Sequence, residues 1–199
     1  MLTQLSTLKA RLAIPDTDQQ YDALLTNAIK SVGARFDKET SRTLARTENA
    51  THEFDPDDTE ILVPCYPIES VTKFELKTTE AEGWVEQPLP DFLIRKNCII
   101  SLARPFILHP SSFILLRVTY SGGYVLPGDP GYQLSTIDHQ LPADLEGAAV
   151  EQSAFWFQHR EKLGIDTTWP HAGTYEKFAD QDILASVRAV LSRYTRYAL

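Results

Sequence analysis

The sequence has little cysteine: two residues, Cys65 and Cys98, in a chain of 199. Neither belongs to a CxxC pair or to a cysteine–histidine cluster, so no zinc-binding pattern is present. We expect two free thiols that pack as small hydrophobic side chains. A disulfide would need strands that bring the two residues together, and a reducing cytoplasm argues against it.

Long apolar runs are missing as well. No run approaches the roughly 20 residues that a membrane helix needs, so we expect no membrane partner. Residues 1–4 do not combine a basic head with an apolar stretch, and we therefore expect no signal peptide. The product should stay in the cytoplasm in which it is made.

Positive charge is scarce. The chain has 19 Lys and Arg residues against 27 Asp and Glu residues, which gives a formal net charge of −8. A protein that grips DNA by neutralising phosphates should be basic, so this chain is a poor candidate for tight DNA binding. Part of the acidic excess is local, in a stretch without Lys or Arg that contains Glu48, Glu53, Asp55, Asp57, Asp58 and Glu60. This stretch is interpreted as a solvated loop or as a surface that repels DNA.

Catalytic motifs are also missing. The sequence has no GxSxG, P-loop, HExxH or GxGxxG pattern, and no two of its five histidines are spaced i, i+3 or i, i+4. As a calcium loop starting at Asp55, the acidic stretch fails, because its sixth and twelfth positions are Glu60 and Tyr66 where Gly and Glu are needed. We therefore predict a protein that is not an enzyme, with no catalytic residues, no metal site and no cofactor.

Helical patterns begin and end the chain. Leucines at helical spacing predict a first helix that ends before Pro15, and Asp16 or Thr17 is placed to cap a second helix over about 18–41. After Pro142, a third helix is predicted to run to about Gly164, and a fourth starts near Asp180. The apolar stripe of the second helix is the clearest, with Tyr21, Leu24, Leu25, Ala28, Ile29, Val32 and Phe36.

The middle of the chain favours strands. β-branched and apolar residues predict strands near 59–64, 71–77, 84–85 and 113–120, and the turn Lys96-Asn97 predicts a hairpin of 92–95 with 98–102. Gly122-Gly123 is typical of a turn at a strand end, and a Gly/Pro-rich linker follows. The predicted fold is therefore α+β: a four-helix bundle with a small β domain inserted between helices 2 and 3. Its predicted parts are 1–48 (helices 1 and 2), 49–124 (β domain), 125–141 (linker) and 142–199 (helices 3 and 4 with a C-terminal tail).

Two groups of residues are candidates for partner binding. Phe155, Trp156 and Phe157 cannot all share one helix face, so at least one faces a second surface, either the β domain or a neighbouring subunit; a thick internal core is the alternative. The end of the chain is basic and aromatic in an acidic protein, which favours a docking tail over a frayed terminus. The candidate contacts with a partner or a neighbouring subunit are Trp156, Phe157, Arg188, Arg193, Tyr194, Arg196, Tyr197 and Leu199.

Three stretches carry a family resemblance. They are residues 8–16 with the long helix that follows, residues 63–72 (Val-Pro-Cys-Tyr-Pro-Ile-Glu-Ser-Val-Thr), and residues 118–124 with Leu-Pro-Ala-Asp-Leu at 141–145. In order and spacing the chain resembles the phage head–tail connector family, also called adaptor or head-completion proteins, in its longer members with a β insertion. Each stretch alone has a sequence that is common in helices and turns. Together the three stretches span most of the chain.

The resemblance implies a structural virion protein located at the neck and assembled in the host cytoplasm. Members of the family form a ring, usually twelvefold, under the portal, extend the DNA channel and provide a platform for the stopper or tail. The expected partners are the portal protein, a stopper or tail-completion protein and further copies of the chain, while DNA passes without tight binding. The alternatives are another neck or tail component (a stopper or tail terminator), a small metal-dependent hydrolase that uses carboxylates between Glu53 and Glu60, and a host binding module.

Overall fold

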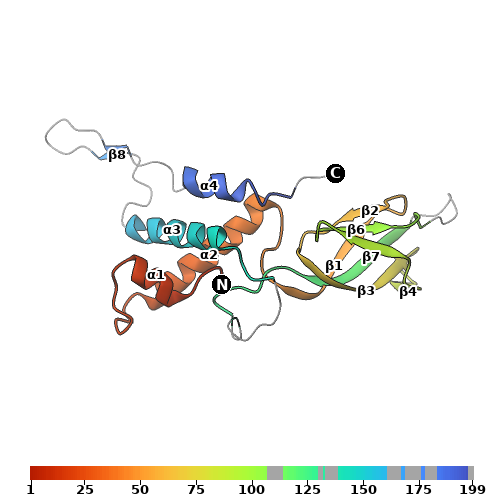
Figure 1. The fold of residues 1–199 in the computed structure, drawn as a ribbon, viewed down its shortest axis with the longest axis horizontal. Coiled ribbons are helices and arrows are strands. Elements are labelled where there is room, and N and C mark those ends of the chain that lie inside the picture. Colours follow the sequence, from red (N-terminus) through yellow and green to blue (C-terminus); the bar gives the residue numbers. More distant parts are fainter. Residues whose placement is uncertain are drawn as a thin grey trace. The chain divides into compact units, whose positions relative to one another are not determined.

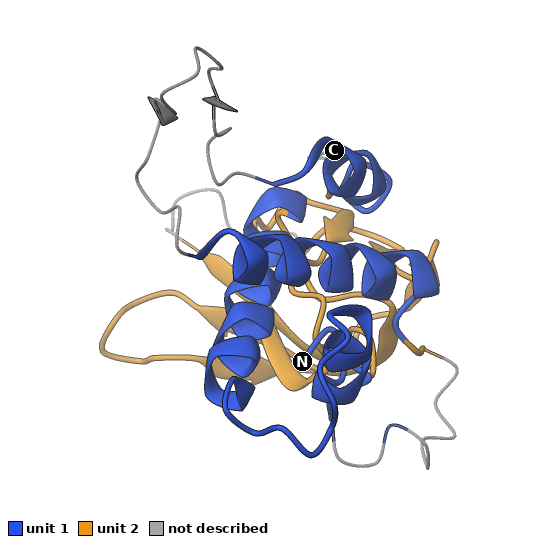
Figure 2. Cartoon of the chain, turned by 90° about the vertical axis from the view of Figure 1, so that its left-hand side faces the viewer, with its two compact units in different colours: residues 1–40, 126–134, 141–195 blue, residues 41–125, 135–140, 196–199 orange. Residues whose placement is uncertain are grey.

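A computed structural model describes residues 1–106, 114–129, 132, 139–160, 167–168, 176–177 and 183–196. The chain is drawn in Figure 1 and divides into two compact units, coloured in Figure 2. Unit 1 comprises residues 1–40, 126–134 and 141–195, and unit 2 comprises residues 41–125, 135–140 and 196–199.

Unit 1 holds the helices. They are α1 (Leu5–Arg11), α2 (Asp22–Thr40), α3 (Ala143–Gln158) and α4 (Ala185–Leu191). Helix α2 packs on α3, α3 also contacts α1 and α4, and α1 contacts α2. The short strands β8 (Thr167–Thr168) and β9 (Glu176–Lys177) pair with each other in the same unit. Four helices and antiparallel strands in the described part of the chain confirm the predicted α+β class.

The apolar stripe of α2 forms because its large side chains recur on one face. Leu25, Ile29, Val32 and Phe36 are all buried, at the i, i+4, i+7 and i+11 spacing of a helix that rests on a core. The α1–α2–α3 core of unit 1 contains Leu8, Leu25, Ile29, Val150, Ala154 and Phe157. Burial of this face stabilises the helices far more than their intrinsic propensities do.

The helix ends differ from the prediction in three places. Helix α2 begins at Asp22, so Asp16 and Thr17 do not cap it. The ammonium of Lys9 donates to the carbonyl oxygens of Asp16 (3.3 Å) and Asp18 (2.7 Å), and these bonds hold the segment as a loop. Helix α3 ends at Gln158, before the predicted Gly164, and α4 begins at Ala185, after the predicted Asp180. Gly164 and Asp180 themselves lie outside the described residues.

Unit 2 holds two antiparallel sheets. The first has the strand order β1-β7-β3-β4, with β1 (Thr47–Phe54), β7 (Leu115–Gly122), β3 (Ile68–Lys77) and β4 (Val85–Gln87). The second has the order β2-β6-β5, with β2 (Glu60–Leu62), β6 (Ile99–Leu102) and β5 (Phe92–Arg95). One core contains residues of both sheets: Phe54, Ile61, Val63, Cys65, Ile68, Phe74, Ile100, Leu102, Leu116, Val118 and Tyr120.

The hairpin predicted around Lys96-Asn97 is confirmed as β5 and β6, with Phe92 opposite Leu102 and Arg95 opposite Ile99. Lys96 and Asn97 have φ values of 50° and 56°. A type I′ turn has positive φ at both central residues, and its twist matches the twist of the flanking strands. Asn tolerates this conformation well, which explains how the turn forms without glycine.

The acidic stretch is not a continuous loop, and this corrects the prediction. Glu48 and Glu53 lie on strand β1 and Glu60 lies on β2, so only the middle of the stretch is a turn. Strand β1 is polar and mostly solvent-facing. Its extended conformation is stabilised by antiparallel pairing with β7. Its sequence lacks the apolar density from which strands are usually predicted.

Candidate functional site

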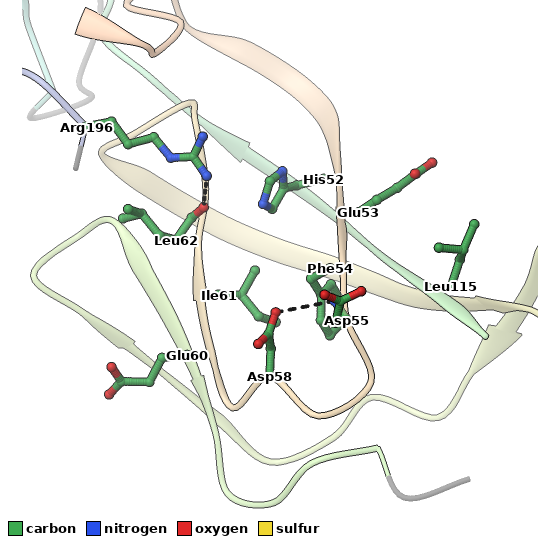
Figure 3. Close-up of a pocket in the computed structure, with 10 residues that line it drawn as sticks. All are labelled: His52, Glu53, Phe54, Asp55, Asp58, Glu60, Ile61, Leu62, Leu115 and Arg196. Carbon is green, nitrogen blue, oxygen red and sulfur yellow. Dashed lines mark hydrogen bonds between the residues drawn. The ribbon is translucent and has the colours of Figure 1, made fainter. Parts of the chain in front are cut away.

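A pocket of about 380 Å³ lies in unit 2 where β1 ends and β2 begins (Figure 3). It has an apolar floor and an acidic rim. The lining residues are His52, Glu53, Phe54, Asp55, Asp58, Glu60, Ile61, Leu62, Leu115 and Arg196. The pocket therefore collects most of the acidic stretch that the sequence singled out, with the exception of Glu48 and of Asp57, which is exposed in the same turn.

A tight turn fixes the acidic rim. The backbone N–H of Asp58 donates to the carbonyl oxygen of Asp55 (3.0 Å), and the N–H of Asp55 donates back to the Asp58 carboxylate (3.3 Å), as drawn in Figure 3. Just before the turn, Phe54 is buried in the core and anchors the end of β1. A short Asp side chain that bonds a nearby backbone N–H is a standard way to stabilise such a turn.

Arg196 enters this pocket from near the end of the chain. Its Nη2 donates to the carbonyl oxygen of Leu62 (2.6 Å), and Figure 3 shows it on the side away from the Asp55–Asp58 turn. Burial lowers the pKa of His52, and the positive charge of Arg196 lowers that pKa further, whereas Glu53 raises it. Four carboxylates and one guanidinium thus line the pocket, so its charge is negative at neutral pH.

Five of the ten residues that line the pocket are charged. None of the ten is a Ser, Thr, Cys, Lys or Tyr. Within the part of the chain that the structure describes, no group of three or more His, Cys, Asp or Glu side chains could hold a metal ion. In the same residues, no helix is both long and apolar enough to span a membrane.

The predicted partner-binding residues that the structure describes are divided between the two units. The Tyr194 hydroxyl donates to Asp144 Oδ1 (2.7 Å) and Arg193 Nη1 lies 3.9 Å from Asp144 Oδ2, both within unit 1. Arg188 is exposed on α4. Arg196 belongs to unit 2, and Tyr197 and Leu199 lie outside the described residues.

The two aromatic candidates on α3 differ from each other. Phe157 is buried in the core of unit 1 and meets Tyr21 edge to face, with ring centroids 5.4 Å apart. Trp156 is half-buried. The internal core that the sequence left open as an alternative thus accommodates Phe157.

Sequence reasoning missed His52 and Leu115 as members of the pocket. Strand β1 was not predicted, so nothing indicated which way its residues point. The alternation of Ala50, His52 and Phe54 was the available signal, because alternate residues of a strand share a face and both Ala50 and Phe54 pack on the core.

The helices and the two antiparallel sheets define a mixed α+β protein. No protein-family model matches its sequence, and no curated protein matches it either. Solved structures do share its fold. A chain of the neck of an empty gene transfer agent (GTA) particle, computed with C6 symmetry, matches with a TM-score of 0.61 and 14% identity, over 100% of this chain and 91% of that chain.

Two further chains give the same result. One comes from the virion of a native GTA particle, with a TM-score of 0.58, 13% identity, and coverage of 100% of this chain and 91% of that chain. The other comes from the neck of a native GTA particle computed with C12 symmetry, with a TM-score of 0.54, 14% identity, and coverage of 90% and 86%. At these identities the likeness establishes a shared fold.

Proposed function

We propose that the chain is a structural, non-enzymatic subunit of the neck of a phage-like particle. The observation that carries this proposal is the fold match to a GTA neck chain over the whole of this chain and 91% of the other. A match over nearly all of both chains, helices and sheets included, is stronger support than a match to one common supersecondary unit. A fold alone does not determine function. The second support is therefore the resemblance of three sequence stretches to the head–tail connector family.

Within the neck, we propose the role of a head–tail connector, or adaptor. The four helices serve as a bundle with the β unit inserted between α2 and α3, and copies of the chain form a ring under the portal that extends the DNA channel. Neck structures computed with C6 and C12 symmetry support an arrangement around an axis. The ring would then provide the platform on which the stopper or tail docks.

The portal contact is proposed at the C-terminal part of the chain, with Arg188, Arg193, Arg196 and the residues that follow, together with Trp156. Arg188 is exposed on α4, as a contact residue needs to be. Arginine and aromatic side chains supply much of the binding energy of protein interfaces. Arg193 and Tyr194 also have contacts within unit 1, so their deletion would disturb that unit as well as any partner.

Passage of DNA without tight binding fits the charge of the chain. A net charge of −8 provides few phosphate contacts, and a carboxylate-rich surface repels the duplex. The acidic pocket of β1 and β2 is the clearest such surface in unit 2.

Electron cryomicroscopy of purified particles tests the proposal. We expect this chain in a ring between portal and tail, with the portal in contact with the C-terminal segment. A chain found at the tail end of the neck would favour a stopper or tail terminator instead, and its absence from the neck would refute the proposal. Calorimetry with Ca²⁺, Mg²⁺ and Mn²⁺ tests the hydrolase alternative, which predicts tight stoichiometric binding.

A further inference from the structure

Unit 2 has two opposite edges at which no further strand pairs among the described residues. The order β1-β7-β3-β4 places β1 and β4 at the two ends of one sheet, and the order β2-β6-β5 places β2 and β5 at the two ends of the other. The pocket described above joins β1 to β2, and we name this side the acidic edge. The connection from β4 to β5 joins the other two end strands, and we name this side the apolar edge.

The apolar edge exposes large hydrophobic side chains. Leu93, Leu89, Val85 and Ile94 are 71%, 55%, 49% and 37% exposed, and they make up four of the six exposed large hydrophobic residues in the described part of the chain. Single exposed leucines are ordinary, whereas a cluster within ten residues on an edge indicates an interaction surface. An uncovered edge of this kind would also invite uncontrolled strand pairing.

Two hollows lie on the surface of the apolar edge. One, of about 360 Å³, is lined by the prolines and Leu89 of the β4–β5 connection and by Phe106. The other, of about 320 Å³, is lined by Asp91, by Ala103 and by residues of β5 and β6, including Leu93. Arg104 lines the first hollow, is exposed, and forms no ion pair with any residue that the structure describes.

The acidic edge complements these features. Leu115 is 43% exposed there, above a floor that includes Ile61. Glu60 on the rim pairs with Arg95, whereas Glu53 and Asp58 have no ion pair among the described residues. The exposed guanidinium of Arg104, which lies beside apolar side chains, is thus complementary in charge to Glu53 and Asp58, which line the same pocket as the exposed Leu115.

We propose that the apolar edge of one copy docks on the acidic edge of the next copy, with Arg104 facing the carboxylates of Glu53 and Asp58. Because the two surfaces differ and lie on opposite sides of unit 2, the contact is head-to-tail. A head-to-tail contact propagates from copy to copy and gives a ring when its rotation closes. The inference rests on the proposed function in that this ring would be the one in the neck.

Cysteine cross-linking tests the contact in the full chain. Leu89→Cys and Asp58→Cys are introduced in a Cys98→Ser background, and a short bismaleimide is added to concentrated protein and to purified particles. The double variant should give a ladder of oligomers, whereas each single variant should remain monomeric. The matched control joins Asp58→Cys to Leu24→Cys, a comparably exposed leucine on α2, and should give no ladder.

Charge reversal provides the second measurement. Arg104→Glu and Glu53→Arg should each reduce cross-linking between neighbouring copies about tenfold, and their combination should restore most of it, because opposite charges again meet. Lys30→Glu, an exposed change on α2, should have no effect. Circular dichroism of each variant verifies that it is folded.

Several outcomes would overturn the edge pairing: no ladder in either preparation, a dimer from Leu89→Cys alone, or charge reversals that do not compensate. Microscopy separates this inference from the proposed function. If the subunits of a neck ring contact each other through other surfaces, the edge pairing is refuted and the neck role still stands. If the charge reversals compensate and the oligomer ladder forms, but the protein is absent from the neck, the neck role is refuted and the edge pairing still stands.

Discussion

Lys9 Nζ lies 2.5 Å from Asp22 Oδ1, so the end of α1 is tied to the start of α2. The Lys9 side chain is 3% exposed, and its ammonium also donates to the carbonyl oxygens of Asp16 and Asp18. A nearly buried lysine is rare unless its charge is paired and hydrogen-bonded, and here both conditions are met. One side chain therefore contacts the α1–α2 connection at Asp16 and Asp18 and the start of α2 at Asp22.

Lys9→Met should destabilise unit 1. Methionine keeps most of the aliphatic volume but removes every donor, which leaves two loop carbonyls and the Asp22 carboxylate without their partner. We expect a loss of about 1–3 kcal/mol, measured by urea denaturation. Lys30→Met, on the exposed face of α2, is the control and should change stability by less than about 0.5 kcal/mol. Equal effects of the two substitutions would contradict the role given to Lys9.

Gly123 should not tolerate a side chain. Its φ is +100°, and a Cβ there would lie 2.6 Å from the carbonyl oxygen of Ala45. Gly123→Ala should therefore cost about 2 kcal/mol or more, from backbone strain and from steric overlap with the main chain. Gly147→Ala in α3 is the opposite case, because nothing lies within 4 Å of its Cβ, and it should stabilise the protein by roughly 0.5–1 kcal/mol. Thermal denaturation of both variants measures the contrast.

Strong local patterns were sufficient for part of the fold. Helix α2 has an apolar stripe that fits only a helix, and the β5–β6 hairpin has a turn residue, Asn97, that accepts positive φ. Strand β1 was missed because its residues are mostly polar and its strand conformation depends on β7, more than 60 positions away in sequence. Pairing over such a distance leaves no local signal.

The candidate site shows the same limit. The carboxylates of the pocket form a run in the sequence, so they were found as a group and misassigned in part as a loop. Arg196 lies 134 positions from Leu62, to which it donates, and no periodicity or spacing links them. The head-to-tail surfaces likewise depend on which strands lie at the ends of each sheet, and strand order is a tertiary property.

Tyr120→Phe should destabilise unit 2 through one lost hydrogen bond. Tyr120 is fully buried, and its hydroxyl oxygen accepts the backbone N–H of Cys65 at 3.1 Å. Phenylalanine fills the same space but leaves this buried donor unpaired, at a cost of about 1–3 kcal/mol in the free energy of unfolding. Phe92→Leu, a change at a half-buried apolar residue of the same unit, removes no hydrogen bond and should leave the Cys65 amide protected. Hydrogen exchange at the Cys65 amide separates the two, since only Tyr120→Phe should accelerate it.

The same tyrosine predicts a loss of stability in alkali. Burial raises the pKa of Tyr120 to about 12, from an ordinary value of 10.0. Between these values the unfolded state releases the phenolic proton and the folded state keeps it, so stability falls as pH rises from about 10 to about 12. In the Tyr120→Phe variant this contribution should vanish, which denaturation at a series of alkaline pH values measures. An unchanged alkaline slope in the variant would refute the assignment to Tyr120.

The lowered pKa of His52 leads us to expect a loss of stability at acidic pH. Burial and then the charge of Arg196 lower its pKa from the ordinary 6.5. Below pH 6.5 His52 is protonated in the unfolded chain but stays neutral in the folded chain. The free energy of unfolding therefore falls as pH drops from 6.5 toward the folded pKa. His52→Gln should flatten this part of the profile, as measured by denaturation across that pH range.

Arg196 variants separate the two causes of that shift. Arg196→Gln removes the positive charge, so the pKa of His52 should rise toward its ordinary value, while burial keeps it from recovering fully. Arg196→Lys retains the charge and should leave the pKa of His52 near its value in the unaltered chain. Titration of the His52 ring by NMR measures both, with Arg11→Gln, an exposed change in unit 1, as the control. If the two Arg196 variants shift the pKa equally, Arg196 acts by covering the ring and not by its charge, and the pocket electrostatics described above would be wrong.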